Sequence, residues 1–340
     1  MPIATISDYW APDIWIRGAR EAFATFPSLW NSSAVARSPQ FDQLASGGGL
    51  TVNVPFFSDI SDQDDELQVE DTAPETTHGH GGEKQVGVFC NRVTKNAVTA
   101  LSAAITGEDP VGDMVNQIAF RRQKQRQKTF LSMLDGAFEP SGPLASIQLS
   151  DTFSESESGQ SDTDDFIDAD MVIDSIALLG EIDEQVENGV ILMHPVIHAA
   201  LLKKDATSFE KESRGAFMIT TYKGMQVIRS SALVRDGTTD GYVYKTYVLK
   251  RRFLAYGEKP QVGDRIDVAS MQYEEDKEKN NSIVYDRGRF LMHINGLVYG
   301  GSPSDADAGP TNAELATPGD WTLGFSSANR CGGVRIQTNG

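Results

Sequence analysis

Alternating apolar and polar residues near the start of the chain predict two strands on either side of a long acidic segment. Residues 50–54 (LTVNV) have the period-two pattern of a half-buried strand, and a second such piece follows at 86–89. Between them, residues 59–83 contain nine acidic residues and no Lys or Arg. We therefore predict a long hairpin with an acidic tip, and loops of this length are usually functional or disordered.

Residues 1–50 contain many large apolar side chains but no continuous periodic pattern. Pro12, Pro27 and Pro39 divide the segment into short pieces, and three of the four Trp residues lie in it. Such an irregular arm has no core of its own, so its aromatic side chains must be buried against the body of the chain or against a neighbouring subunit. The aromatic residues that we expect at this contact are Trp10, Trp15, Phe23 and Trp30.

The pattern from Gly107 onward predicts a helix over 108–136. Pro110 suits the first helical turn, nearby acidic residues suit the positive end of the helix dipole, and Gly136 suits the position after the helix. At 1.5 Å per residue the helix is roughly 40 Å long. Its middle is polar on every side, which is typical of a helix that bridges rather than packs in a core. The cations of this middle are Arg121, Arg122, Lys124, Arg126 and Lys128.

These five cations need counter-charge, and we expect it to come from nucleic acid or from the acidic stretch 151–187. That stretch has thirteen acidic residues and no basic one. The remaining pattern predicts a mixed α/β unit over about 166–250 and a returning set of strands over 250–300. The fold class is therefore α+β.

The bulk composition indicates a folded protein without a membrane span. The formal net charge of −18 disfavours general nucleic-acid binding but is compatible with an acidic wall around packed nucleic acid, and its simplest interpretation is solubility. No apolar run reaches the roughly 18 residues of a transmembrane helix, and the N-terminus lacks a secretory signal. Cys90 and Cys331 alone form no disulfide framework, which fits a reducing cytoplasm.

Three motifs could suggest metal chemistry, and each lacks a required feature. His194 and His198 have the spacing of two ligands on one helix face, but Pro195 replaces the Glu of a zinc-protease motif and indicates that His194 ends a strand. The His-Gly-His piece at 78–80 suits a solvated turn, and the Asp cluster at 162–170 lacks the Gly of a calcium loop. We therefore expect no catalytic residue, no cofactor and no metal.

The order of these segments resembles the major capsid proteins of tailed bacteriophages that have the Hong Kong 97-type fold. The resemblance covers essentially the whole chain, and its strength lies in the order and spacing of loose motifs. These are Tyr9-Trp10, GEDP (107–110), RGRFLMHINGLVYG (287–300), and PTNAELA (310–316) followed by Trp321.

The resemblance implies a division of the chain into an arm, a loop and two domains. The implied parts are an N-terminal arm (1–50), an extended loop (51–90), a peripheral domain (91–140 and 250–305) with the spine helix 108–136, and an axial domain (141–249 and 306–340).

The resemblance also implies a shell-building protein that is not an enzyme. We expect it to form the hexamers and pentamers of an icosahedral head, which encloses genomic double-stranded DNA without sequence-specific binding. The implied partners are a separate scaffolding protein, a portal protein and, in some shells, decoration proteins. The place of action is the virion capsid, assembled in the host cytoplasm. An encapsulin-like compartment shell is the alternative.

Two sets of residues should then meet other molecules in the shell. The cation cluster is expected to face the shell interior or acids of a neighbouring subunit. Only Lys84 lies near the extended loop, so we expect no Lys–Asn cross-link through that loop. The loop acids expected to contact the adjacent subunit are Asp62, Asp64, Asp65, Glu66 and Glu70.

Overall fold

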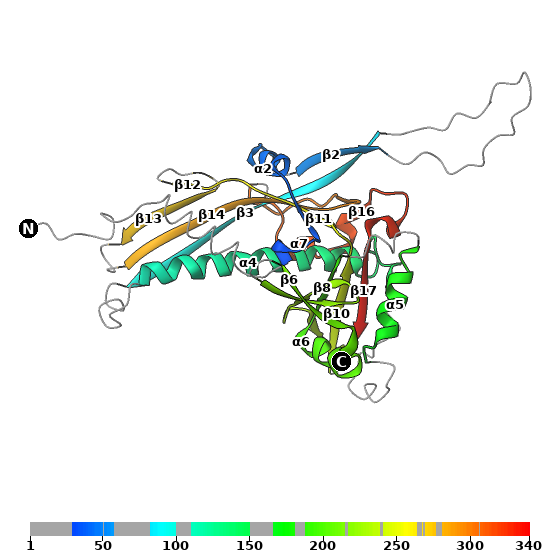
Figure 1. Cartoon of the computed structure of the whole chain (residues 1–340). Coiled ribbons are helices and arrows are strands. Elements are labelled where there is room, and N and C mark those ends of the chain that lie inside the picture. The colour runs from blue at the N-terminus through cyan, green and yellow to red at the C-terminus, as the bar shows by residue number, and fades with distance from the viewer. Residues whose placement is uncertain are drawn as a thin grey trace, which may run out of the picture.

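The chain forms two β-sheets joined by one long helix (Figure 1). The computed structural model describes residues 29–49, 51–57, 82–99, 110–149, 166–180, 188–214, 217–238, 241–263, 267, 269–276, 281–305 and 307–340. The helices described are α2 (Pro39–Ser46), α4 (Pro110–Phe138), α5 (Ala169–Ala177), α6 (Pro195–Lys204) and α7 (Asn312–Leu315).

Within the described residues, one sheet has nine strands and follows the order β1-β11-β14-β3-β15-β16, with β2, β12 and β13 paired at its margins. Its strands are β1 (Val35–Arg37), β2 (Thr51–Phe57), β3 (Gly82–Thr99), β11 (Leu254–Glu258), β12 (Val262–Gly263), β13 (Ser270–Asp276), β14 (Asn281–Ile294), β15 (Leu297–Tyr299) and β16 (Trp321–Leu323).

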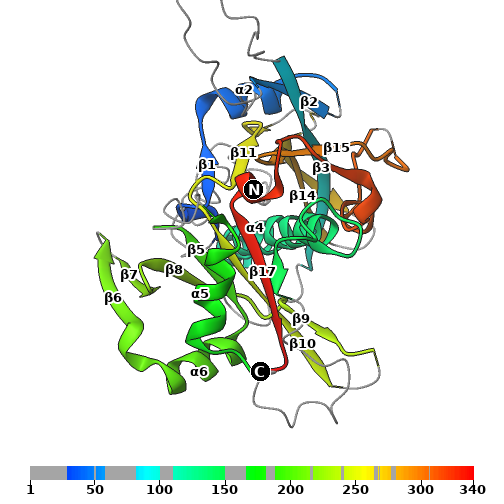
Figure 2. The same cartoon turned by 90° about the vertical axis from the view of Figure 1, so that its right-hand side faces the viewer.

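The second sheet has eight described strands in the order β4-β17-β10-β5-β8-β7-β6, with β9 paired to β10. Figure 2 shows β17 running beside β10 to the C-terminus. The strands are β4 (Gln148–Leu149), β5 (Val190–Met193), β6 (Phe209–Arg214), β7 (Phe217–Tyr222), β8 (Met225–Arg229), β9 (Val234–Asp236), β10 (Tyr242–Leu249) and β17 (Gly333–Thr338). The two sheets and their helices confirm the predicted α+β class.

The predicted hairpin is confirmed at its base. Strands β2 and β3 pair antiparallel, from Thr51 opposite Val88 to Phe57 opposite Gly82. Strand β3 then continues as the long partner of β14, and the β2–β3 ribbon projects from the body of the molecule (Figure 1). The acidic tip between these strands lies outside the described residues.

The described part of the arm, residues 29–49, is regular rather than irregular, which corrects the expectation from its prolines. Strand β1 pairs parallel with β11, and helix α2 follows it directly. Pro39 is the first residue of α2, where its missing N–H costs nothing, and the Ser38 side chain caps the helix by accepting a hydrogen bond from Phe41 N (3.3 Å). The proline that seemed to break the segment instead begins a helix.

The long helix predicted over 108–136 is confirmed with shifted bounds: it begins at Pro110 and runs through Gly136 to Phe138. Gly136 does not terminate the helix, because its role is in packing. A Cβ at this position would lie 2.3 Å from Leu315 O and 2.6 Å from Trp321 Nε1. Only glycine allows α7 and β16 to approach α4 this closely. Among the described residues, no helix is long and apolar enough to cross a membrane.

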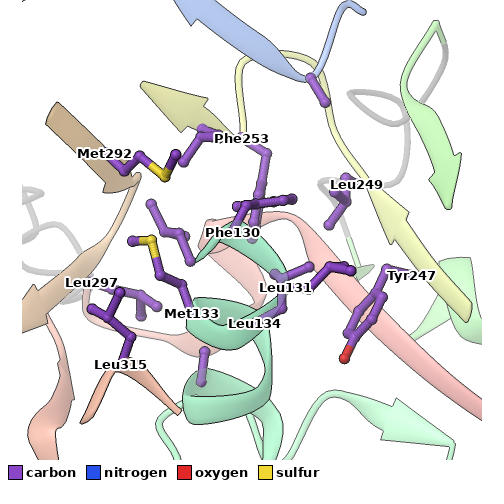
Figure 3. Packing of buried hydrophobic residues seen from close by; sticks show 14 of the residues in the cluster. Phe130, Leu131, Met133, Leu134, Tyr247, Leu249, Phe253, Met292, Leu297 and Leu315 are labelled. Carbon is purple, nitrogen blue, oxygen red and sulfur yellow. The ribbon is translucent and has the colours of Figure 1, made fainter. Parts of the chain in front are cut away.

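The C-terminal half of α4 lies at the centre of the main core, which is continuous between the two sheets (Figure 3). Strand β5 shows how the second sheet is covered on both faces. Val190 and Leu192 face the α4 core, whereas Ile191 and Met193 pack in a second cluster under α5 and α6. A strand that is buried on both faces has a continuous apolar sequence. The residues of α4 labelled in the core are Phe130, Leu131, Met133 and Leu134.

Candidate functional site

Two arginines of the predicted cation cluster are paired with acids of the nine-stranded sheet. Arg122 donates from Nε to Asp286 Oδ2 (2.9 Å), and its Nη2 contacts the other carboxylate oxygen. Gln261 completes the group, since its Oε1 accepts from Arg122 (2.7 Å) and its Nε2 donates to Asp286 (2.9 Å). Both charged side chains are nearly buried, with 12% and 8% of their surface exposed.

One turn further along α4, Arg126 is buried in a second group. Its Nη2 donates to Glu258 Oε1 (3.0 Å), and the Tyr256 hydroxyl donates to Glu258 Oε2 (2.9 Å). The guanidinium carbon lies 3.5 Å from the centre of the Phe290 ring, a close cation–π contact. Gly288 makes room for the guanidinium, because a Cβ there would lie 2.8 Å from Arg126 Nη2.

These pairs keep both carboxylates ionised. Burial by itself would raise the pKa of Asp286, but the charge and hydrogen bonds of Arg122 outweigh burial and lower that pKa. The pKa of Glu258 is lowered in the same way: burial opposes the shift, and Arg126 and Arg122 supply it. The two pairs therefore fix α4 on β11 and β14 with fully charged partners.

The structure thus corrects the expectation for Arg122 and Arg126. Their counter-charge comes from Asp286 and Glu258 of the same chain rather than from nucleic acid or the stretch 151–187. The polar middle of α4 also packs on the sheet, because paired arginines can be buried along with their aliphatic stems. The three other cations of the cluster stay exposed on α4: Arg121, Lys124 and Lys128.

A second charged group, which sequence reasoning missed, ties the C-terminal end of α4 to the eight-stranded sheet. Arg335 of β17 is 1% exposed and donates to Glu139 Oε1 (2.9 Å) and to the carbonyl of Phe138 (2.8 Å). Lys245 of β10 donates to Asp135 (2.6 Å) and Glu139 (3.3 Å). Helix α4 is therefore bound by ion pairs to both sheets.

The PTNAELA motif at 310–316 also makes contacts within the subunit, to α4 and to β3. Thr311 and Glu314 form a capping box at the start of α7, and α7 packs on α4. The backbone just before α7 accepts hydrogen bonds from β3: the Arg92 side chain donates to the carbonyl of Pro310 (2.6 Å), and the backbone N–H of Asn91 donates to that of Ala308 (2.9 Å). The motif therefore connects strand β3 to helix α4.

Among the residues described, no three or more His, Cys, Asp or Glu side chains gather in a way that could hold a metal. His194 ends β5 and caps α6, with Nδ1 accepting from Val196 N (3.2 Å), as the Pro195 argument predicted. The His-Gly-His piece at 78–80 lies outside the described residues.

Comparisons with known proteins agree with this geometry. No known family profile matches the chain. A curated relative, the major capsid protein of Bacillus phage SPP1, is 24% identical over 329 residues, which cover 94% of both chains. Among solved structures, the capsid of Ralstonia phage GP4 has a TM-score of 0.62 at 11% identity and covers 92% of this chain and 91% of its own. The capsid of cyanophage Pam1 has a TM-score of 0.53 at 10% identity and covers 100% and 98%.

The chain has the Hong Kong 97-type fold, and over nearly its whole length it is similar to a phage major capsid protein. The fold expected from the order of its motifs is thereby confirmed, and the expected resemblance to phage major capsid proteins agrees with the curated relative. The charged residues that the structure pairs most tightly hold the subunit together. The expected assembly contacts need separate consideration.

Trp30 is the one expected arm contact that lies within the described residues, and it is buried in its own subunit. Only 2% of it is exposed, its Nε1 donates to Gln123 O (3.3 Å), and its ring lies 4.9 Å from that of Tyr256. Trp30 is therefore a core residue rather than an intersubunit contact. The other expected contact residues lie outside the described residues: Trp10, Trp15, Phe23, Asp62, Asp64, Asp65, Glu66 and Glu70.

Proposed function

We propose that this capsid protein assembles with itself, as hexamers and pentamers, into a closed icosahedral shell that encloses double-stranded DNA. The observation that carries this proposal is the contrast between a rigid body and a projecting ribbon. Ion pairs at the middle and at the C-terminal end of α4 bind the helix to the two sheets, whereas the β2–β3 ribbon leaves the body (Figure 1). An isolated two-stranded ribbon is marginally stable in water, so a neighbouring subunit is needed to cover it.

The two sheets suggest the places of the two domains in such a shell. The nine-stranded sheet with α4 would form the peripheral domain, and the eight-stranded sheet would form the axial domain around the capsomer centre. The C-terminal tail contributes to both, since β16 pairs in the first sheet and β17 in the second. Subunits in this arrangement would act as structural building blocks without catalysis.

Assembly would depend on two segments that reach the neighbour. The acidic segment 59–83 would lie across the adjacent subunit, because nine carboxylates without an internal cation repel one another. Residues 1–28 would supply the aromatic contact, with Trp10, Trp15 and Phe23 as anchors. The charge contact would weaken with added salt.

The exposed cations of α4 would face the shell interior. Arg121, Lys124 and Lys128 recur along one side of the helix at intervals of three and four residues. They would provide the sequence-independent attraction for packaged DNA that the acidic remainder of the chain lacks.

Other partners follow from this role. A separate scaffolding protein would guide assembly in the host cytoplasm, a portal protein would occupy one vertex, and decoration proteins would bind the finished virion capsid.

Electron microscopy of particles assembled in cells, combined with nuclease digestion, tests the proposal. We expect closed shells whose DNA is protected from nuclease. Shells that contain enzyme cargo and no DNA would instead indicate an encapsulin-like compartment. A dispersed monomer at high concentration would contradict self-assembly.

A further inference from the structure

A cavity of about 810 Å³ lies at the junction of the two sheets. Its walls come from β1, the start of α2, the segment just before β5, and the turn between β10 and β11. The wall residues that matter below are Ser33, Arg37, Asn188, Arg251, Arg252 and Asn295.

The charge of the cavity is positive. Three arginines and no carboxylate are found among the described residues that line it. Arg37 lies over the Tyr256 ring, 5.0 Å from its centre, whereas Arg251 and Arg252 are exposed. Arg122 and Arg126, unlike the exposed Arg251 and Arg252, are ion-paired within the described part of the subunit. The cavity therefore presents the exposed guanidinium groups of Arg251 and Arg252 to an anion of another molecule.

The backbone holds the Arg252 side of this wall in an unusual conformation. Arg252 has a φ of 59°, in the left-handed region that a residue with a bulky side chain rarely adopts. Arg252 N donates to Ser33 O (2.9 Å), and Asn295 Nδ2 donates to Arg252 O (2.8 Å). Asn188, also left-handed with a φ of 61°, accepts from Ser33 Oγ (2.6 Å) through its carbonyl. Such conformations persist where surrounding contacts enforce them, and they gather at binding sites.

The edge of the nine-stranded sheet borders the cavity. Strand β1 ends the strand order, and its one partner in the described part of the chain is β11. A strand at an edge can hydrogen-bond to an extended segment of another chain. The cavity thus combines arginines that could pair with acidic side chains and a strand edge that could hydrogen-bond to the backbone of the same segment.

We propose that this cavity receives the acidic segment 59–83 of a second copy of the chain. The proposal rests on the proposed shell function and names its acceptor site. Charge complementarity selects the occupant, since the segment has nine acidic residues and no Lys or Arg. The competing acceptor is the exposed cation row of α4, Arg121, Lys124 and Lys128, which is not part of this cavity.

A charge-swap experiment tests the proposal in the full chain. The cavity variant carries Arg251→Glu and Arg252→Glu, and the loop variant carries Asp64→Lys and Asp65→Lys. A third chain carries all four changes. The matched control, Lys203→Glu with Lys211→Glu, makes the same charge change at exposed positions of α6 and β6 that have no part in either acceptor. A competing-acceptor variant carries Lys124→Glu and Lys128→Glu. Circular dichroism and thermal unfolding of free subunits verify that each variant is folded.

We expect loss of shells in the cavity variant and in the loop variant, shells again in the four-fold variant, and normal shells in the control. Normal shells in the cavity variant, or loss of shells in the four-fold variant while its subunits stay folded, would overturn the proposal. Loss in the competing-acceptor variant with normal assembly in the cavity variant would overturn the proposal and assign the acceptor to α4 instead.

A binding measurement separates this proposal from the shell function. A synthetic peptide of residues 59–83 is titrated into free subunits and followed by fluorescence anisotropy. We expect binding at low salt that is lost in the cavity variant and kept in the control. If the wild-type chain binds the peptide but forms no shell, the shell function fails and the acceptor site stands. Equal binding to wild type and cavity variant would overturn the acceptor site.

Discussion

Replacing Asp286 by Ala tests whether the α4 cations serve the fold. The substitution leaves the Arg122 guanidinium, 12% exposed in the native subunit, without its charged partner. It also removes the hydrogen bonds from Arg122 Nε (2.9 Å) and Gln261 Nε2 (2.9 Å). Loss of one partner of a buried ion pair typically costs about 3–5 kcal/mol. We expect a loss of this size in the free energy of unfolding.

Urea unfolding of the free subunit measures this loss, and a variant in which both members of the pair are replaced identifies its cause. Arg122→Met combined with Asp286→Leu replaces the pair by apolar groups of similar size, which is often nearly neutral. The double variant should therefore be more stable than Asp286→Ala. Added salt should change the cost little, because buried pairs are weakly screened.

The reasoning would be refuted by a small effect. If Asp286→Ala lowers the free energy of unfolding by less than about 0.5 kcal/mol, as expected for exposed substitutions, Arg122 has no structural dependence on this carboxylate. In that case the original hypothesis, that nucleic acid or another subunit supplies the counter-charge, would regain its basis.

Three further predictions concern the core and the arm. Burial lowers the pKa of His293 to about 4, so the free energy of unfolding should fall by about 3 kcal/mol as the pH drops from 6.5 toward 4. This fall should be absent in His293→Gln, and a variant with the same pH dependence of unfolding as the wild type would contradict the prediction. Gly136→Ala should cost about 1–3 kcal/mol in urea unfolding, because the new Cβ meets the backbone of Leu315; unchanged stability would refute the packing role of this glycine. Deleting residues 1–28 should leave the thermal unfolding of free subunits unchanged but abolish the shells seen by electron microscopy, and normal shells would show that this segment makes no subunit contact. Trp30→Ala, by contrast, should lower the free energy of unfolding by about 3–5 kcal/mol, because Trp30 is a core residue.

Local patterns predicted the elements whose causes are local. The alternation at residues 50–54 predicted the hairpin base, Pro110 marked the first residue of α4, and Pro195 correctly placed His194 at a strand end. Each of these signals acts within a few residues. Pro39 shows the limit, because a proline that breaks one element can also begin a helix.

The charged contacts of α4 depend on residues far apart in the chain. Arg122 and Asp286 are 164 residues apart, and Arg335 meets Glu139 from a distance of 196 residues. No pattern in a single sequence indicates which acid pairs with which arginine across such distances. The polar middle of the helix was therefore interpreted as bridging, with counter-charge from nucleic acid or from the stretch 151–187. Two of its five cations, Arg122 and Arg126, needed only acids on neighbouring strands to be buried.

A cryo-electron microscopy reconstruction of the assembled particle tests the central claim most directly. The account predicts a closed icosahedral shell in which the eight-stranded sheet surrounds each capsomer centre and the nine-stranded sheet with α4 lies at the periphery. In the same map, density for segment 59–83 should lie on the adjacent subunit. Monomers without closed shells, or segment 59–83 folded back on its own subunit, would contradict the account.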